Sequence, residues 1–139
     1  PDGRSLLGSD GFSISLWDVV EHRRLHQFST GHRVHGFAVS GDGKTCAARS
    51  LHSVSVWDTT TWTKTSEIPS ERGLPNLDVS YDGALVAQVA ESGVRVTDRL
   101  GKPAAFHNCP EGTTLCVRFL PKGDKVAFGG SAGIVFRSG

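Results

Sequence analysis

Hydrophobic and polar residues alternate one by one in several short stretches of the chain. Residues 53–57 read Ser-Val-Ser-Val-Trp, and residues 13–17 and 94–96 follow the same alternation. A period of two is typical of a β-strand with one buried face. No stretch shows a sustained period of 3.6 residues, which an amphipathic helix would need. We therefore predict strands and essentially no helix.

Each alternating stretch lies between less regular β-type runs. Before it, residues 37–40 and 45–48 flank the turn pair Asp42-Gly43, which predicts a hairpin. After it comes a stretch with a weaker pattern, which suits an outer edge strand. The stretches of this kind are residues 24–28, 64–68 and 103–106, with Lys64 and Pro103 as residues that discourage further pairing. The predicted unit is therefore four short antiparallel strands.

This unit recurs along the whole chain at a constant step and without an insertion. The turn pairs Asp2-Gly3, Asp42-Gly43, Asp82-Gly83 and Lys122-Gly123 are evenly spaced. Hydrophobic columns keep the same step: Leu6, Cys46, Val86 and Val126; Ala47, Ala87 and Ala127; Ile14, Val54, Val94 and Ile134; Leu16, Val56, Val96 and Phe136. A repeat of about 40 residues with four strands is the size of a β-propeller blade. We expect Ala47, Ala87 and Ala127 to be buried at equivalent positions, and Trp17 and Trp57 to be largely buried.

The second copy resembles a WD40 repeat. Gly31-His32, the run Ser40-Gly41-Asp42-Gly43 and the stretch ending in Trp57-Asp58 have the order and spacing of that family. The resemblance covers the whole chain but weakens in the third copy, which has Glu71-Arg72 in place of Gly-His and Thr97-Asp98 in place of Trp-Asp.

The resemblance implies an all-β, WD40-like β-propeller, here an open arc of two complete and two partial four-stranded blades. In the strand order of the family, residues 31–70 and 71–110 are complete blades, and residues 1–30 and 111–139 are blade remnants of one partial propeller domain. The chain then begins and ends within a blade, so we expect it to be a fragment of a longer protein. A ring of seven or eight blades needs roughly 280–320 residues at this period, and the rest of that chain would supply the missing blades.

Several residues match structural signature positions of the family: Trp17, Asp18, Trp57, Asp58, Asp98 and His32. In WD40 repeats the histidine joins a buried hydrogen-bond network with a turn aspartate, a strand Ser or Thr, and the tryptophan. Here Leu51-His52-Ser53 occupies the turn where that aspartate is expected. We therefore predict an incomplete network, in which loss of His32 costs about 1 kcal/mol.

Charge and composition exclude some classes of partner. The formal net charge of +1 argues against a general nucleic-acid or anionic-membrane surface. No apolar run approaches the roughly 18–20 residues of a membrane-spanning helix. Cys46, Cys109 and Cys116 are interpreted as reduced cytosolic thiols in preference to a Cys109–Cys116 disulfide. The compartment stays open, with the cytoplasm favoured.

Candidate catalytic and metal-binding residues each have a structural explanation. The Asp-Gly pairs are too far apart along the chain to form a calcium loop. His22, His26, His32 and His35 come from opposite edges of different blades, so we do not expect them to converge on zinc. The glycine-rich residues 129–133 lack the lysine and the helix of a phosphate-binding loop, and no serine has a nucleophile-elbow context. We predict no catalytic residue, no metal and no cofactor.

The family resemblance also indicates where a partner would bind. In a WD40 ring, the loops that join strand d to strand a and strand b to strand c open on one face, which commonly takes peptides or proteins. These loops carry Arg33, Arg49, His52, Arg72 and Glu91, and arginine is frequent at binding hot spots. The main hypothesis is a WD-repeat protein–protein interaction module or scaffold within a larger multidomain protein, with no nucleic-acid partner.

The alternative is a fragment of a propeller-scaffold enzyme, such as a quinone-dependent dehydrogenase or a lyase. Such an enzyme needs charged residues that converge from successive innermost strands. Asp78 and Arg118 align in that column of the repeat. We interpret this single pair as an ion pair between blades.

Overall fold

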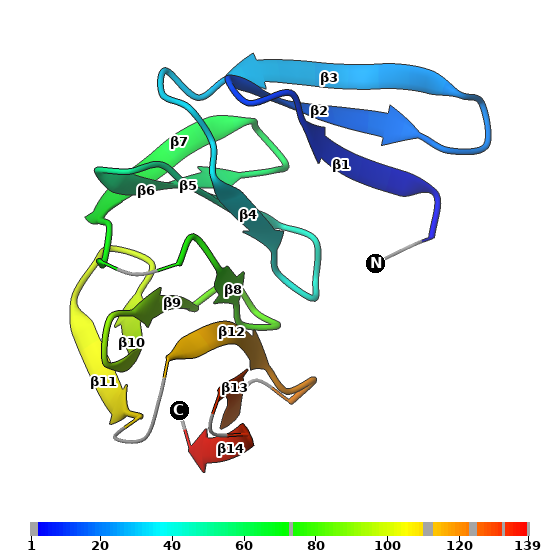
Figure 1. The fold of residues 1–139 in the computed structure, drawn as a ribbon. Helices are drawn as coiled ribbons and strands as arrows, with labels where there is room; N and C mark the ends of the chain where they lie inside the picture. The colour runs from blue at the N-terminus through cyan, green and yellow to red at the C-terminus, as the bar shows by residue number, and fades with distance from the viewer. Residues whose placement is uncertain (1–2, 73, 110–112, 123–124, 132, 139) are drawn as a thin grey trace.

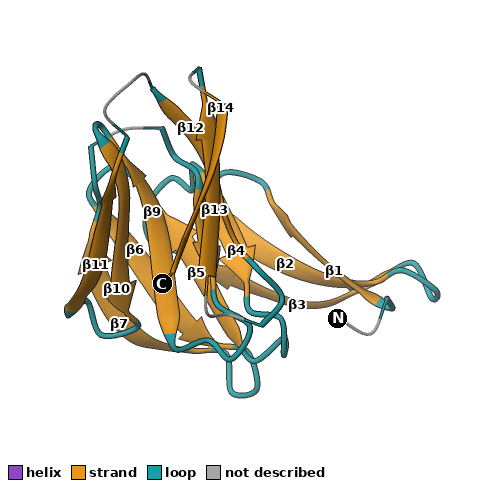
Figure 2. Ribbon diagram, turned by 90° about the horizontal axis from the view of Figure 1, so that it is seen from below, coloured by secondary structure: helices purple, strands orange, loops and turns teal. Residues whose placement is uncertain are grey.

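The computed structural model describes residues 3–72, 74–109, 113–122, 125–131 and 133–138. These residues form fourteen strands and no helix, as the alternation predicted (Figure 2). The strands are β1 (Ser5–Ser9), β2 (Ser13–Asp18), β3 (Arg23–Ser29), β4 (Gly36–Val39), β5 (Thr45–Arg49), β6 (Ser53–Asp58), β7 (Thr63–Pro69), β8 (Leu77–Val79), β9 (Leu85–Ala90), β10 (Gly93–Asp98), β11 (Pro103–Asn108), β12 (Thr114–Phe119), β13 (Lys125–Gly130) and β14 (Gly133–Ser138).

The strands form four antiparallel sheets that follow one another around an arc (Figure 1). The first sheet has the order β1-β2-β3, the second β4-β5-β6-β7, the third β8-β9-β10-β11 and the fourth β12-β13-β14. In every sheet, strands that are neighbours in the sequence pair with each other. The predicted all-β open arc of two four-stranded and two partial blades is confirmed.

The Asp-Gly turns between the first two strands of a blade are built by a repeated Ser-x-Asp-Gly motif. The Asp42 Oδ1 atom accepts hydrogen bonds from Ser40 Oγ at 2.6 Å and from the Lys44 amide at 2.9 Å. The Asp82 Oδ1 atom does the same with Ser80 Oγ at 2.7 Å and the Ala84 amide at 3.0 Å. Gly43 and Gly83 have φ of 75° and 72°, a conformation that favours glycine. Asp2 and Gly123, of the outer two copies, lie outside the described residues.

The aspartates at the ends of β2, β6 and β10 stabilise the turn that follows each strand. Asp18 Oδ1 accepts from the Val20 and Glu21 amides, both at 2.9 Å. Asp58 Oδ1 accepts from the Thr60 amide at 2.7 Å, and Asp98 Oδ1 accepts from the Leu100 amide at 2.9 Å. These three aspartates are therefore side-chain caps of turns.

Hydrophobic residues of the repeated columns fill the space between neighbouring sheets. Ala47, Val54 and Val56 of the second sheet form one cluster with residues of the third sheet, and Ala87, Val94 and Val96 form the next cluster with the fourth. Ala47 and Ala87 are fully buried, as predicted. Ala127 is only half-buried because no further sheet in the described part of the chain covers the fourth one.

The two tryptophans of the Trp-Asp pairs are less buried than predicted. Trp57 is half-buried, and its ring packs on Phe28 of the first sheet with centroids 4.6 Å apart. Trp17 is 39% exposed, so its predicted burial is wrong. Trp17 faces away from the second sheet. Trp57 faces the corresponding side of its own sheet, where the first sheet covers it, but no described sheet precedes the one that holds Trp17.

The network predicted to be incomplete is absent among the described residues, and the partial bond expected of His32 is not formed. The His32 side chain is exposed and makes no hydrogen bond to any described residue, although its carbonyl oxygen accepts from Thr30 Oγ1 at 2.6 Å. The Nε1 atom of Trp57 is buried and has no hydrogen-bond partner among the described residues. The turn aspartate that would accept a hydrogen bond from the histidine in a WD40 repeat is missing here, and the His32 side chain lies at the surface.

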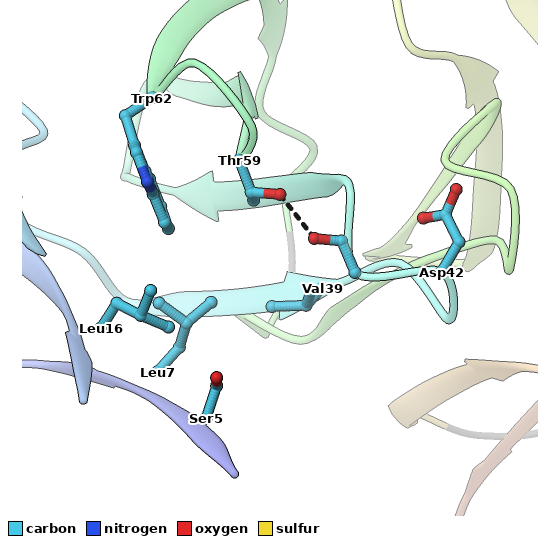
Figure 3. A pocket seen from close by; sticks show the side chains of 8 residues that line it. Ser5, Leu7, Leu16, Val39, Asp42, Thr59 and Trp62 are labelled. Carbon is cyan, nitrogen blue, oxygen red and sulfur yellow. Dashed lines mark hydrogen bonds between the residues drawn. The ribbon is translucent and has the colours of Figure 1, made fainter. Parts of the chain in front are cut away.

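The first and second sheets diverge more than the later pairs. A hollow of about 310 Å³ opens between them, and Leu7, Leu16, Val39 and Trp62 turn towards one another around it (Figure 3). At the equivalent place between the second and third sheets the Thr45 side chain packs directly against Gly83, where a Cβ atom would clash with Thr45 Oγ1.

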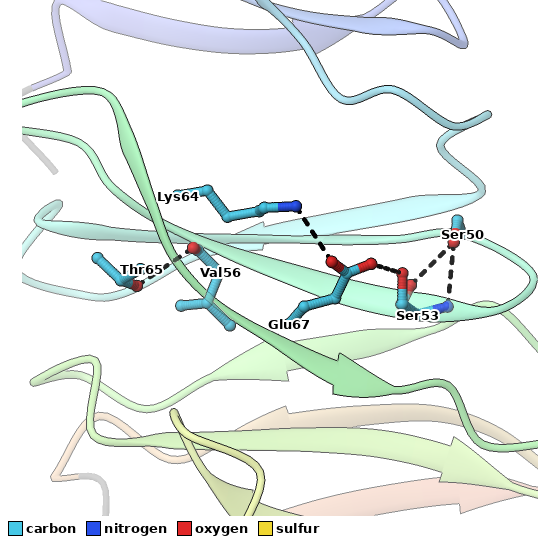
Figure 4. Close-up of polar contacts among 6 residues, drawn as sticks. All are labelled: Ser50, Ser53, Val56, Lys64, Thr65 and Glu67. Atoms are coloured by element: carbon cyan, nitrogen blue, oxygen red, sulfur yellow. Dashed lines mark hydrogen bonds and ion pairs between the residues drawn. The ribbon is translucent and has the colours of Figure 1, made fainter.

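The outer strand β7 is held along its length by side-chain contacts. Glu67 accepts hydrogen bonds from Lys64 Nζ at 3.1 Å and from Ser53 Oγ at 2.6 Å, and Thr65 Oγ1 donates to the Val56 carbonyl at 3.2 Å (Figure 4). Strand β7 thus carries a charged pair on its exposed side, which suits an edge strand.

Candidate interaction face

The loops that join β3 to β4, β5 to β6 and β7 to β8 meet at one end of the sheets. The Thr30 amide donates to the Phe12 carbonyl at 3.1 Å, and one repeat later the Ser70 amide donates to the His52 carbonyl at the same distance. The His35 amide donates to the Arg49 carbonyl at 2.8 Å. The Val34 amide also donates to the Gly11 carbonyl at 2.6 Å, which links the loops of the first and second sheets. We call the end of the sheets that carries these loops and the equivalent β9–β10 loop the loop face.

Four of the five predicted contact residues are exposed on this face. Arg33 lies in the β3–β4 loop, His52 in the β5–β6 loop, Arg72 in the β7–β8 loop and Glu91 in the β9–β10 loop. Their role in partner binding stays a prediction.

Arg49 is different, because it is 2% exposed. Its guanidinium group lies under the β7–β8 loop and donates to oxygen atoms of that loop and of β9. The acceptors are Ser70 Oγ at 3.0 Å from Nε, the carbonyls of Leu74, Asn76 and Val89 at 2.9, 3.2 and 3.1 Å from Nη1, and the carbonyl of Glu71 from Nη2. The prediction that Arg49 contacts a partner is wrong, since the loop covers it.

All acceptors of Arg49 are neutral oxygens, so its positive charge is not cancelled by a hydrogen-bonded carboxylate. Burial lowers the pKa of the guanidinium, and the nearby charge of Glu71 opposes that effect. Arginine remains protonated in proteins even so. Arg49 holds the loop at Ser70, Glu71, Leu74 and Asn76 and contributes positive charge beneath these residues.

The same loop is also attached to the third sheet. The Glu71 amide donates to Gln88 Oε1 at 3.1 Å, and Gln88 Nε2 donates to the Pro69 carbonyl at 3.2 Å. The Glu71 carboxylate forms an ion pair with Arg95 of β10. Gln88 is fully buried, so its side-chain amide bonds the loop backbone and does not reach the surface.

Two adjoining hollows lie on the loop face and share His35 and Pro75. One, of about 320 Å³, lies between the β5–β6 and β7–β8 loops and is lined by Arg49, Leu51, Glu71 and Arg72, among others. The second, of about 280 Å³, extends towards the innermost strands and is lined by Phe37, Leu74, Leu115 and Arg118, among others. We call the two together the loop groove.

Asp78 and Arg118 do not form the predicted ion pair. Asp78 is half-buried, and its Oδ2 atom accepts a hydrogen bond from the Phe119 amide at 2.7 Å. Burial raises the pKa of this carboxyl, while that hydrogen bond and the charge of Arg118 oppose the shift. Arg118 Nη1 donates to the Val117 carbonyl at 2.8 Å. The link between β8 and β12 is therefore from side chain to main chain.

The described residues show no arrangement suited to metal binding. No group of three or more His, Cys, Asp or Glu side chains among them could hold an ion. The three cysteines are free thiols, and burial raises the pKa of Cys46 to about 12. No helix in the described part of the chain has the length and apolar character needed to cross a bilayer.

Sequence comparisons find no relative, whereas structural comparison does. No protein-family model and no curated protein matches the sequence. Many solved structures match the fold. One is hydrazine synthase from Kuenenia stuttgartiensis, with a TM-score of 0.79 and 18% sequence identity over 99% of this chain.

The chain covers 44% of that hydrazine synthase chain. At this identity the similarity shows the fold alone. The chain thus has a partial β-propeller-type fold, the open arc described above.

Proposed function

We propose that this chain is a WD-repeat-like interaction module whose loop face binds a protein or peptide partner. The WD40-like motifs of the second copy support the family assignment. The exposed Arg33, His52, Arg72 and Glu91 provide polar contacts that a partner could use.

The observation that carries the proposal is the way Arg49 holds the β7–β8 loop. A buried arginine and a buried glutamine both bond this loop, yet Arg72 and Leu74 on the same loop project to the surface. A loop that is fixed in place and still presents arginine and leucine to solvent is a pre-organised binding surface.

The second candidate is a propeller-scaffold enzyme fragment. The fold similarity to a chain of hydrazine synthase favours it. Against it, Asp78 and Arg118 are both bonded to main-chain atoms and do not converge on a shared point.

Selection of a random peptide library against the immobilised protein tests the interaction module. We expect the selected peptides to lose at least about tenfold in affinity for Arg72→Glu. Lys102→Glu is the matched control, because Lys102 is an exposed cation in a turn at the opposite end of the sheets. Selected peptides that bind both variants equally, or a selection that yields no binder, would contradict the proposal.

A further inference from the structure

The loop groove has an excess of positive charge. Its lining includes three arginines, Arg49, Arg72 and Arg118, and one acidic residue, Glu71. The carboxylate of Glu71 is already paired with Arg95. Glu71 also lies near Arg49 and Asp78 lies near Arg118, so Arg72 is the arginine of this lining without an acidic partner among the described residues.

The two exposed cations, Arg72 and Arg118, keep their charge available to a ligand. Arg118 is exposed and donates to neutral oxygens, namely the Asn76 side chain and the carbonyls of Leu77 and Val117. Arg72 is exposed and forms no ion pair with a described residue. Positive groups that share one concave surface add their fields and attract an anionic partner.

Exposed leucines lie beside these arginines. Leu51 is 74% exposed, Leu115 is 50% exposed and Leu74 is 42% exposed, and all three line the groove. Arginine next to exposed apolar side chains is the composition of protein-binding hot spots. A ligand that matches the groove must therefore bring both negative charge and apolar side chains.

We propose that the loop groove binds an extended acidic peptide in which carboxylate and apolar side chains alternate. In an extended chain successive side chains point to opposite sides. Leu51 and Arg72 lie on the two loops that flank the first hollow, so one side of the peptide could meet Arg72 while the other meets Leu51. A nucleic acid fits less well, because its phosphates would leave the three leucines without a contact. The inference rests on the proposed function and names the chemistry of the partner.

Fluorescence anisotropy with a labelled peptide of alternating glutamate and leucine tests the inference. We expect saturable binding that weakens as salt is raised. Arg72→Glu and Arg118→Glu should each weaken binding at least about tenfold, and Lys102→Glu should leave it unchanged. Leu51→Ser should also weaken it, and Arg72→Gln serves as a milder variant if Arg72→Glu does not fold by circular dichroism.

Three control ligands decide the specificity. Peptides of alternating lysine and leucine, or of alternating glutamate and serine, should bind at least about tenfold more weakly than the glutamate–leucine peptide. Equal binding of either peptide, or tighter binding of oligouridylate, would overturn the inference. If the library selection yields non-acidic peptides that still depend on Arg72, the interaction module stands and the acidic partner is refuted.

Discussion

A single side chain, that of Arg49, shapes the loop face from beneath. It satisfies oxygens of a loop that lies well beyond it in sequence, from Ser70 to Leu74. A buried main-chain carbonyl that loses its donor costs about 1–3 kcal/mol. The position of the loop therefore depends on a residue that no partner would touch.

Arg49→Met should lower the free energy of unfolding by roughly 3 kcal/mol or more, because several buried oxygens lose their donor at once. Arg49→Lys should cost less, since an ammonium group keeps the charge and offers three donors in place of five. Urea unfolding measures both variants. A loss below about 0.5 kcal/mol for Arg49→Met would show that water replaces the guanidinium without cost.

Trp57 offers the opposite case, a buried polar atom with no partner among the described residues. Trp57→Phe should be neutral or slightly stabilising, because it removes the unbonded Nε1 group and keeps an aromatic ring against Phe28. Trp57→Ala should cost roughly 3 kcal/mol, the lower end for a large aromatic because the ring is only half-buried. Thermal melts of the two variants decide the point. A Phe variant as unstable as the Ala variant would mean that Nε1 is in fact bonded, for example to water.

At the residue scale, sequence placed most of the candidate site but not the role of Arg49. Arg33, His52, Arg72 and Glu91 are exposed because loop tips are exposed in any blade. Arg49 is covered by a loop from the next repeat, and local pattern carries no information on that contact. A signal was present, since the column of Arg49 holds Ser9, Val89 and Gly129 in the other copies. A charged residue in a strand column that otherwise holds small or apolar residues indicates that its side chain is buried and hydrogen-bonded inside the protein.

At the scale of single elements, the Ser-x-Asp-Gly turns make the stability of the fold depend on pH. Hydrogen bonds from Ser40 and from the Lys44 amide lower the pKa of Asp42, and hydrogen bonds from the Ala84 amide and from Ser80 lower the pKa of Asp82. A carboxyl whose pKa is lowered on folding stabilises the native state above its unfolded pKa. That contribution is lost as pH falls through the lower, folded value.

We therefore expect the melting temperature to fall as pH drops below the ordinary aspartate pKa of 3.8. Replacement of both Ser40 and Ser80 by alanine should make this fall shallower, because the pKa values of Asp42 and Asp82 then return towards that value. Melting curves between about pH 5 and pH 2 test it. An unchanged pH slope in the double variant would mean that other carboxyls, such as Asp10 or Asp58, dominate the acid sensitivity.

The elements themselves were largely predictable because each has a local cause. Strict alternation marks β2, β6 and β10, and the Asp-Gly pairs mark the turns before β5 and β9. Burial was less predictable, since it depends on what packs against a strand. The same column gives a fully buried Cys46, which packs against the preceding sheet, and an exposed Leu6, which has no preceding sheet among the described residues.

At the scale of the whole molecule, the two ends of the arc present apolar faces. Ile134 and Phe136 are 73% and 59% exposed, whereas Val54, Val56, Val94 and Val96 in the same columns are fully buried. At the other end Leu6 and Trp17 are exposed. Apolar faces of repeat units are normally covered by neighbouring repeats.

Residues 1–139 alone should therefore self-associate at micromolar concentration. Ile134→Lys together with Phe136→Lys should reduce the association, because charges on the exposed face disfavour contact between copies. Multi-angle light scattering measures the mass. A monodisperse 14.8 kDa species of the unaltered chain would contradict the expectation.

The ungapped period has a consequence for how such a chain can change its length. Every junction between sheets uses the same columns, so a segment one period long begins and ends at equivalent backbone positions wherever it is cut. Removal of residues 41–80 would join Ser40 to Tyr81, which puts the turn of one copy in the place of another. Blades of this kind behave as interchangeable cassettes. If one blade were removed or duplicated, the same hydrophobic columns would still meet at each junction between sheets. Features outside the shared columns, such as the clamp of Arg49 on its loop, would be lost or doubled together with their cassette.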